Sequence, residues 1–83
     1  MSKKIGRVIH YFDKINVAVV KLTKGDLKVG DKVKLVSREG KDFEQTVSSM
    51  QIEHADIDIA QSGDEFGLKV QKPVKDKSEI LKI

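Results

Sequence analysis

Short runs of alternating apolar and polar residues, separated by turn residues, fill most of this 83-residue chain. An alternation with a period of two is typical of strands that bury one face. No stretch shows the 3.6-residue period of a long amphipathic helix. The pattern therefore predicts an all-β fold, with strands in residues 5–12, 17–22, 27–35 (around a turn), 43–52, 65–70 and 78–83.

Two glycine-aspartate pairs mark turns that each lead into an alternating strand. Gly30-Asp31 lies within "LKVGDKVKL", residues 27–35, and Gly63-Asp64 lies within "SGDEFGLKV", residues 62–70. Glycine supplies the positive φ angle that such turns need, and aspartate favours turns. After these turns the alternation predicts that the inward side chains are Val33, Leu35, Phe66, Leu68 and Val70.

One predicted strand, residues 43–52, changes phase along its length. Val47 lies on the odd face, whereas Met50 and Ile52 lie on the even face, so a regular strand cannot bury all three. We expect a β-bulge near Ser48-Ser49, as a strongly bent strand requires. Gly67, inside the later strand, indicates a further bend or a close approach of two backbones.

Six short strands in so short a chain predict a small six-stranded antiparallel closed β-barrel. The length allows one domain, so we expect a single barrel over residues 5–83 after a flexible tail of residues 1–4. Residues 53–64 are expected to form a longer connection. The chain has no cysteine and no apolar run long enough for a signal peptide or a membrane span, and we expect a soluble cytoplasmic protein.

Charge is distributed unevenly along the sequence. Residues 1–42 hold eleven Lys or Arg against five Asp or Glu, residues 43–68 hold none against six, and residues 69–83 hold five against two. The balances are therefore +6, −6 and +3, which sum to the net charge of +3. Opposed basic and acidic surfaces would follow if the segments stayed apart, and mixed charge would follow if folding interleaves them. The sequence leaves both arrangements open.

No pattern of residues indicates catalysis or a cofactor. The serines lie outside the GxSxG and SxxK motifs, and the phosphate-binding GxxxxGK[ST] and GxGxxG motifs are absent. His10 and His54 are the only histidines, and without cysteine or a calcium-loop pattern they do not predict a metal site. We therefore expect no enzyme activity, no cofactor, and no nucleotide bound by this chain alone.

Nucleic-acid binding agrees better with the composition. The sequence pI is about 9.2, and a basic surface can contact phosphates. Only Tyr11, Phe12, Phe43 and Phe66 are aromatic, and we expect the three phenylalanines in the core, which leaves few rings for base stacking. Charge alone is compatible with RNA or with an acidic protein as the partner.

Three segments, in this order and spacing, resemble the second domain of translational GTPases. They are "GDLKVGDKVKL" at residues 25–35, "TVSSMQIEH" at residues 46–54 and "AQSGDEFGLKV" at residues 60–70. This domain is the β-barrel of elongation factor Tu and of its archaeal and eukaryotic counterpart. The resemblance extends from about Gly6 to Ile83, and the chain is most similar to short stand-alone elongation-factor-like proteins. Similar segments occur at the ends of some collagenase-like peptidases.

The resemblance implies a six-stranded antiparallel barrel and a role in translation (protein biosynthesis). In the full factors this barrel sits beside a GTPase domain and contacts the small ribosomal subunit. In elongation factor Tu it also helps to hold the aminoacylated acceptor end of tRNA. By this match, Gln51 falls where the family often has a glutamate near the terminal adenosine. His54 falls where a basic residue or histidine lies beside the aminoacyl group.

Two hypotheses about function follow. The first is a non-catalytic translation elongation factor-like domain that binds tRNA, rRNA or the ribosome through a basic face. The second is a protein-interaction module that docks on a partner enzyme or GTPase. Neither involves a membrane. For the first hypothesis the candidate nucleic-acid-binding residues are Arg7, Lys32, Lys34, Arg38, Gln51 and His54.

Overall fold

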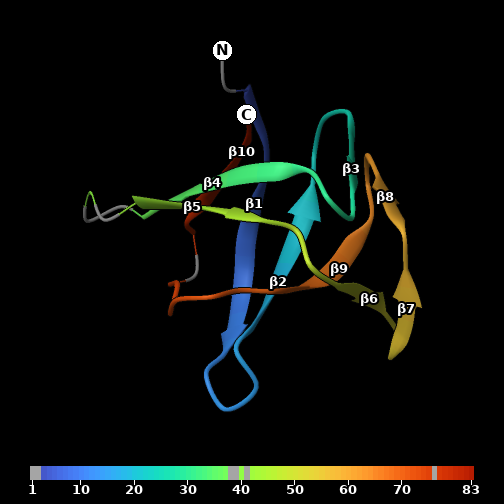
Figure 1. The fold of residues 1–83 in the computed structure, drawn as a ribbon, viewed down its shortest axis with the longest axis horizontal. Helices are drawn as coiled ribbons and strands as arrows, with labels where there is room; N and C mark the ends of the chain where they lie inside the picture. Colours follow the sequence, from blue (N-terminus) through green and yellow to red (C-terminus); the bar gives the residue numbers. More distant parts are fainter. Residues whose placement is uncertain (1–2, 38–39, 41, 76) are drawn as a thin grey trace.

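The computed structural model describes residues 3–37, 40, 42–75 and 77–83, and within them it forms ten strands and no helix (Figure 1). No helix that could span a membrane occurs in this described part of the chain. The strands are β1 (Lys3–Phe12), β2 (Val17–Leu22), β3 (Asp26–Lys28), β4 (Lys32–Val36), β5 (Asp42–Thr46), β6 (Met50–Ile52), β7 (Ala55–Ile57), β8 (Ile59–Gln61), β9 (Glu65–Lys69) and β10 (Glu79–Lys82).

Eight of the strands form one antiparallel sheet in the order β5-β4-β10-β1-β2-β9-β6-β7, and β3 pairs with β8 in a second, two-stranded sheet. Figure 1 shows the large sheet curled into a half-barrel: β4 and β5 cross β1 and β2, β9 lies beside β2, and the connection that follows β9 crosses β1 and β2 at another level. The predicted all-β antiparallel architecture is confirmed. The prediction of six strands is wrong, since the described residues form ten. The prediction of full closure is also wrong, because no backbone ladder joins the edge strands β5 and β7 among the described residues.

The four additional strands come from three segments. Residues 27–35, which were predicted as one strand around a turn, form β3 and β4. Residues 43–52 divide into β5 and β6 at residues 47–49, the place where the bulge was expected, and both Val47 and Met50 are buried as a result. The expected connection at residues 53–64 contains β7 and β8. Strands of three residues are too short to show a reliable alternation.

The core fills the concave side of the half-barrel. Its buried apolar side chains come from nearly every strand and include all five that the two turn motifs predict to point inward. They are Ile5, Val8, Ala18, Val20, Leu22, Leu27, Val33, Leu35, Val47, Met50, Ala60, Phe66, Leu68, Val70, Val74 and Ile80.

β1 departs from a simple alternation because its register shifts twice, once between Lys4 and Gly6 against β10 and once between Val8 and His10 against β2. Each shift inserts an extra residue and moves the following side chains to the opposite face. The shift between Val8 and His10 puts Phe12 on the face opposite to the buried Val8, and Phe12 is 47% exposed. The prediction that Phe12 lies in the core is wrong. Phe43 is only partly buried, whereas Phe66 is fully buried as expected.

The two chain ends lie side by side. Lys3 pairs with Lys82 and Lys4 pairs with Leu81, so β1 begins two residues earlier than the expected start of the barrel at residue 5. Figure 1 shows both termini at the same end of the molecule.

The two glycine-aspartate turns have the same geometry. In each turn the aspartate backbone N–H donates to the carbonyl three residues earlier, from Asp31 to Lys28 at 3.0 Å and from Asp64 to Gln61 at 2.9 Å. The aspartate Oδ2 accepts the N–H of that same earlier residue, at 2.9 Å in both turns. The preceding glycines have φ angles of 99° and 94°. A side chain at either position would strain the backbone, since positive φ favours glycine.

These matched turns close the half-barrel at one end. The strands that enter them, β3 and β8, pair with each other, and the strands that leave them are β4 and β9. Lys82 of β10 reaches the first turn, with its Nζ 3.3 Å from Asp31 Oδ2 and 3.5 Å from Asp26 Oδ1. The Lys28 backbone N–H, and then the Lys82 ammonium, hold the pKa of Asp31 below its usual value. Partial burial lowers the pKa of Lys82, but its carboxylate partners outweigh this effect and raise it.

On the open side of the half-barrel, a buried glutamine links β5 to the end of β9. Gln45 on β5 is 4% exposed, its Nε2 donates to Lys69 O at 2.8 Å, and its Oε1 accepts the Gln71 N–H at 2.9 Å. The side-chain amide thus acts as one peptide unit between β5 and the end of β9. It satisfies backbone groups that a closed barrel would pair through a strand.

We expect Gln45→Ala to lower the free energy of unfolding by about 2–4 kcal/mol, because it leaves a partly buried carbonyl and N–H without partners. Urea denaturation followed by circular dichroism measures this loss. Gln71→Ala is the matched control, since it removes an exposed amide and keeps the backbone N–H. Equal losses for the two variants would contradict the bridging role of Gln45.

Asp31→Asn should destabilise the chain by less than about 1 kcal/mol at neutral pH, because the pair with Lys82 is partly exposed. The depressed pKa of Asp31 gives stability that is present above the unfolded pKa, near 3.8, and is lost as the pH falls through the lower folded pKa. Urea unfolding at pH 7, 5, 3 and 2 should therefore show the wild-type advantage shrinking only below about pH 4. Lys82→Met should cost less in the Asp31→Asn background than in the wild type. An advantage that stays constant over this range would refute the linkage.

Candidate functional site

The convex face of the sheet carries a strip of outward side chains across β1, β2, β9 and β6. Strand register defines two rows: Phe12 opposes Val17, which opposes Lys69, and the second row runs through His10, Val19, Gly67 and Gln51. The residues of the row between them are mostly buried, which confirms that these two rows face outward. We call this surface the outer strip; its members are His10, Phe12, Val17, Val19, Gln51, Gly67 and Lys69.

A recess of about 350 Å³ lies at the end of the outer strip towards β6. It is lined by apolar atoms of Ile15 and Val17, by the Gly67 backbone, and by the polar ends of Gln51 and Lys69, together with Ser49. A Cβ atom at position 67 would lie 3.0 Å from Val17 Cγ1. The close contact at Gly67 is thus with a side chain and not with the backbone expected, since Gln51 O would lie 3.8 Å from that Cβ atom. The missing side chain helps to keep the recess open.

Two hydrogen bonds orient the polar groups of this recess. Lys69 Nζ donates to Ile15 O at 2.9 Å, which leaves two of its N–H donors for other acceptors. Gln51 Nε2 donates to Asp56 Oδ1 at 2.9 Å across the β6–β7 hairpin. A recess lined by two apolar side chains, the Gly67 backbone, an ammonium group and an amide can accept a small group that carries polar atoms.

The hairpin that holds Gln51 and His54 has a strained turn. Ile52 pairs with Ala55, so the loop has two residues, and Glu53 and His54 have φ angles of 51° and 65°. Positive φ at both positions is the type I′ geometry, which favours Asn-Gly. Glutamate and histidine are unfavourable there, and strain of this kind clusters at functional sites.

Two aromatic rings extend the outer strip beyond the recess. The rings of His10 and Phe12 meet edge to face with centroids 4.4 Å apart, and both side chains are exposed. β1 and β9 are both neighbours of β2, so the backbone at His10 lies about 10 Å from Gly67. Ile9 and Ile15 are also exposed, at 37% and 56%. The strip therefore joins aromatic and apolar surface to a polar recess.

The predicted basic residues lie elsewhere. Lys32 and Lys34 are on β4, and each is paired with an acidic residue of β5: Lys32 Nζ is 3.5 Å from Glu44 Oε1, and Lys34 Nζ is 3.1 Å from Asp42 Oδ2. The Lys32–Glu44 pair joins the basic segment, residues 1–42, to the acidic segment, residues 43–68, whereas the Lys34–Asp42 pair lies within the basic segment. Arg7 is exposed on β1, two strands from β4. Arg38 lies outside the described residues.

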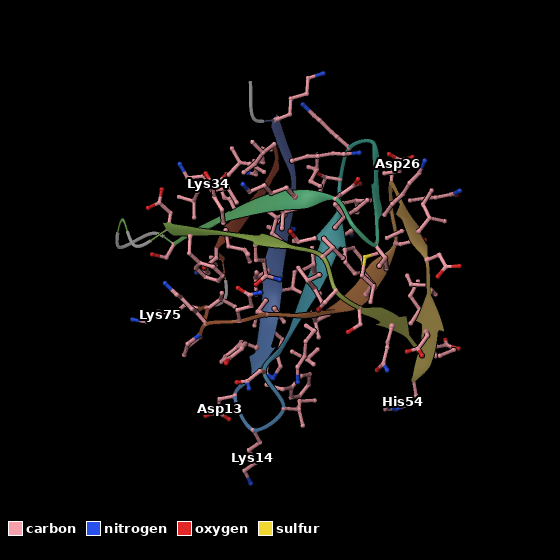
Figure 2. All side chains as sticks on the ribbon, in the orientation of Figure 1. Asp13, Lys14, Asp26, Lys34, His54 and Lys75 are labelled. Atoms are coloured by element: carbon pink, nitrogen blue, oxygen red, sulfur yellow. The ribbon has the colours of Figure 1, made fainter. Side chains whose placement is uncertain are left out.

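The five predicted binding residues that the structure describes thus do not form one site. Gln51 and His54 belong to the β6–β7 hairpin, at the opposite end of the sheet from β4. Figure 2 shows Lys34 and His54 on opposite sides of the molecule. Within the described residues, no three histidine, aspartate or glutamate side chains gather where they could hold a metal ion.

Comparison with known families identifies the fold. The sequence profile of the family "Elongation factor Tu domain 2" matches residues 16–80. The chain belongs to this family. The resemblance carried by the three sequence motifs is therefore confirmed, and the half-barrel is an elongation factor Tu domain 2-type fold.

Relatives of this domain 2 chain are parts of larger proteins. It is 35% identical over 77 residues to an uncharacterized protease of Methanocaldococcus jannaschii, and the match covers 93% of this chain but 19% of that protein. The chain thus spans about a fifth of its relative. Two crystal structures of the C-terminal domain of a candidate U32 peptidase from Geobacillus thermoleovorans share the fold. Their TM-scores are 0.89 and 0.86, their identities 22% and 21%, and they cover 98% and 94% of this chain, which covers 92% and 96% of theirs.

The sequence predicted Gln51 as a candidate binding residue, but it did not predict the other members of the outer strip. Phe12 was assigned to the core, His10 was expected to be exposed or packed without a role, and Lys69 received no role. The signal was the alternation itself: Val17, Gly67 and Lys69 occupy the outward positions of β2 and β9. Only the pairing of these strands shows that their outward positions are neighbours.

We expect the double substitution Glu53→Asn with His54→Gly to raise the free energy of unfolding by about 1 kcal/mol or more, because Asn-Gly adopts the type I′ turn with little strain. Thermal and urea unfolding measure the gain. The same substitution at Asp13 and Lys14, in the longer β1–β2 loop, serves as a control and should bring no comparable gain. A loss of stability in the β6–β7 variant would show that the native turn carries no strain.

Proposed function

We propose that this chain is a non-catalytic RNA-binding domain that takes a nucleotide at the recess of the outer strip. The observation that supports this proposal most directly is the position of Gln51. Gln51 falls where the resembling family often has a glutamate near a terminal adenosine, and it lines a recess of about 350 Å³.

The chemistry of the recess suits an unpaired nucleotide at an RNA end. The Val17 and Ile15 side chains and the bare Gly67 backbone offer a flat apolar contact for a base, and Lys69 can pair with a phosphate. The exposed His10 and Phe12 rings could stack a neighbouring base, which supplies the aromatic surface that a basic patch alone lacks.

Arg7, Lys32 and Lys34 have a secondary part in this proposal. Because Lys32 and Lys34 are already paired with β5 carboxylates, they would give weaker, longer-range attraction for phosphates. The acidic residues of the β6–β7 hairpin, including Glu53 and Asp56, oppose non-specific binding there. We therefore propose selective binding of an RNA end by the recess rather than coating of RNA by a basic face.

The test is fluorescence anisotropy with a 5′-labelled single-stranded RNA of eight nucleotides that ends in an unpaired adenosine. We expect saturable binding that weakens with added salt, and a several-fold loss when the 3′ end is blocked by a bulky group. Lys69→Met and Gln51→Ala should each weaken binding about 5- to 20-fold.

Lys24→Met is the matched control for Lys69→Met, because Lys24 is an exposed lysine outside the strip. It should change binding less than twofold. Tight binding that depends on Arg7 or Lys34, tested as Arg7→Glu and Lys34→Glu, and not on Lys69 or Gln51 would move the site to the basic residues. Absence of saturable RNA binding at low salt would reject the proposed function.

A second function is favoured by the exposed side chains of Ile9, Phe12 and Ile15, which are 37%, 47% and 56% exposed. In a longer protein like the relatives, these three side chains, of which only Phe12 belongs to the outer strip, could dock on the remaining domains. Such docking would resist salt, whereas phosphate contacts would not. Co-purification with a U32 peptidase-like protein at high salt, lost in Phe12→Ser, would support this alternative.

A further inference from the structure

A second cavity, separate from the outer strip, lies between the β4–β5 hairpin and the connection from β9 to β10. Its volume is about 440 Å³, within the range of small-molecule sites. Leu35, Phe43 and Val74 provide its apolar lining. The cavity occupies the side of the half-barrel that backbone pairing leaves open, next to the strand held by Gln45.

The wall of this cavity contains a buried hydroxyl group without a partner. Ser78 is 1% exposed, and its Oγ forms no hydrogen bond with the residues that the structure describes. The backbone of Ser78 is fully used, since its N–H donates to Lys75 O at 3.2 Å and its carbonyl accepts the Val8 N–H at 2.8 Å. An unpaired buried hydroxyl is costly, so its retention points to an acceptor that comes from outside the chain.

The backbone beside Ser78 is held in an unfavourable conformation. Lys77 has a φ angle of 70°, and its N–H donates to Val8 O at 2.7 Å. Residues other than glycine are uncommon in this conformation, and it persists where surrounding contacts enforce it. The contacts with β1 therefore fix the position of the Ser78 hydroxyl.

Positive charge lies around the cavity. Lys72 and Lys75 both line it, and Lys72 Nζ lies 5.7 Å from the centroid of the Phe43 ring. Among the lining residues that the structure describes, the one carboxylate belongs to Asp42, and it is paired with Lys34 at 3.1 Å. The lining thus combines aromatic and aliphatic side chains, two ammonium groups and the hydroxyls of Ser37 and Ser78.

We propose that this cavity binds a small organic carboxylate with an aryl-sized apolar body. The apolar body packs on Leu35, Phe43 and Val74. A carboxylate oxygen accepts a hydrogen bond from the Ser78 hydroxyl, and the Lys72 ammonium neutralises the charge. This site is independent of the proposed RNA binding, because it shares no lining residue with the recess of the outer strip.

The test uses 3-phenylpropionate as the probe and follows ¹H–¹⁵N spectra of the 83-residue chain. We expect saturable shifts at Phe43, Val74 and Ser78, with Kd on the order of 1 mM, and no matching shifts at Gln51 or Gly67. 3-Phenylpropanol lacks the charge and propionate lacks the ring, and each should bind at least fivefold more weakly.

Two variants separate binding from folding. Ser78→Ala should weaken 3-phenylpropionate binding about fivefold while leaving Tm unchanged or higher, because it removes an unpaired buried hydroxyl. Lys72→Met should weaken binding by a similar factor, and Lys14→Met, in the distant β1–β2 loop shown in Figure 2, should not.

Three results would overturn the proposal. The first is the absence of saturation at 10 mM, as expected if only water satisfies Ser78. The second is equal binding of 3-phenylpropionate and 3-phenylpropanol, which would show that the cations have no role. The third is a lower Tm in Ser78→Ala with unchanged affinity, which would show that the hydroxyl stabilises the fold. RNA binding should be unaffected by Ser78→Ala and Lys72→Met, so failure of this proposal and failure of the proposed function are distinguishable.

Discussion

The matched turns at Gly30-Asp31 and Gly63-Asp64 are the constraint on which the rest of this structure depends. In each turn an aspartate side chain and its own N–H bind the same residue three positions earlier, so the chain reverses at a fixed angle. The strands that enter the turns, β3 and β8, pair with each other. The strands that leave them, β4 and β9, stand on either side of the β10-β1-β2 centre of the sheet. The short β3–β8 ladder therefore holds the two sides of the sheet together and enforces its curl.

This half-barrel carries two candidate binding sites whose lining residues differ in chemistry. On the convex face, the outward positions of β1, β2, β9 and β6 form the outer strip, with exposed rings at one end and a recess beside Gln51 at the other. On the open side, the Gln45 amide replaces a strand ladder, and the neighbouring connection leaves a cavity. The cavity lies where the sheet does not close through its backbone, whereas the recess lies on the convex face over the paired strands β2, β9 and β6. Incomplete closure in so small a domain leaves concave surface that a tightly closed barrel would fill with side chains.

Charge in this protein is arranged by strand pairing more than by sequence segment. Lys32 and Lys34 come from the basic first half of the chain, yet β4 pairs with β5 and brings Glu44 and Asp42 beside them. Lys82 reaches back to Asp31 and Asp26 from the far end of the chain. Of these pairs, Lys32–Glu44 joins the basic segment to the acidic one, whereas Asp42, Asp31 and Asp26 belong to the basic segment itself. Two other cations lie at the candidate sites: Lys69 at the recess of the outer strip, and Lys72 at the cavity beside Phe43.

The sequence by itself determined the all-β class, the inward residues after both turns, the break near Ser48-Ser49 and the family. These features depend on neighbours in the chain: alternation, turn residues and motif spacing are local properties. Only the tertiary structure decided that β3 pairs with β8, that the sheet stays open, and that Phe12 is exposed. It also decided which outward residues meet. Two bulges in β1 reverse the faces of its side chains, and pairing joins residues as distant as Phe12 and Lys69 through Val17. Such contacts depend on register between segments far apart in the sequence, which no local pattern encodes.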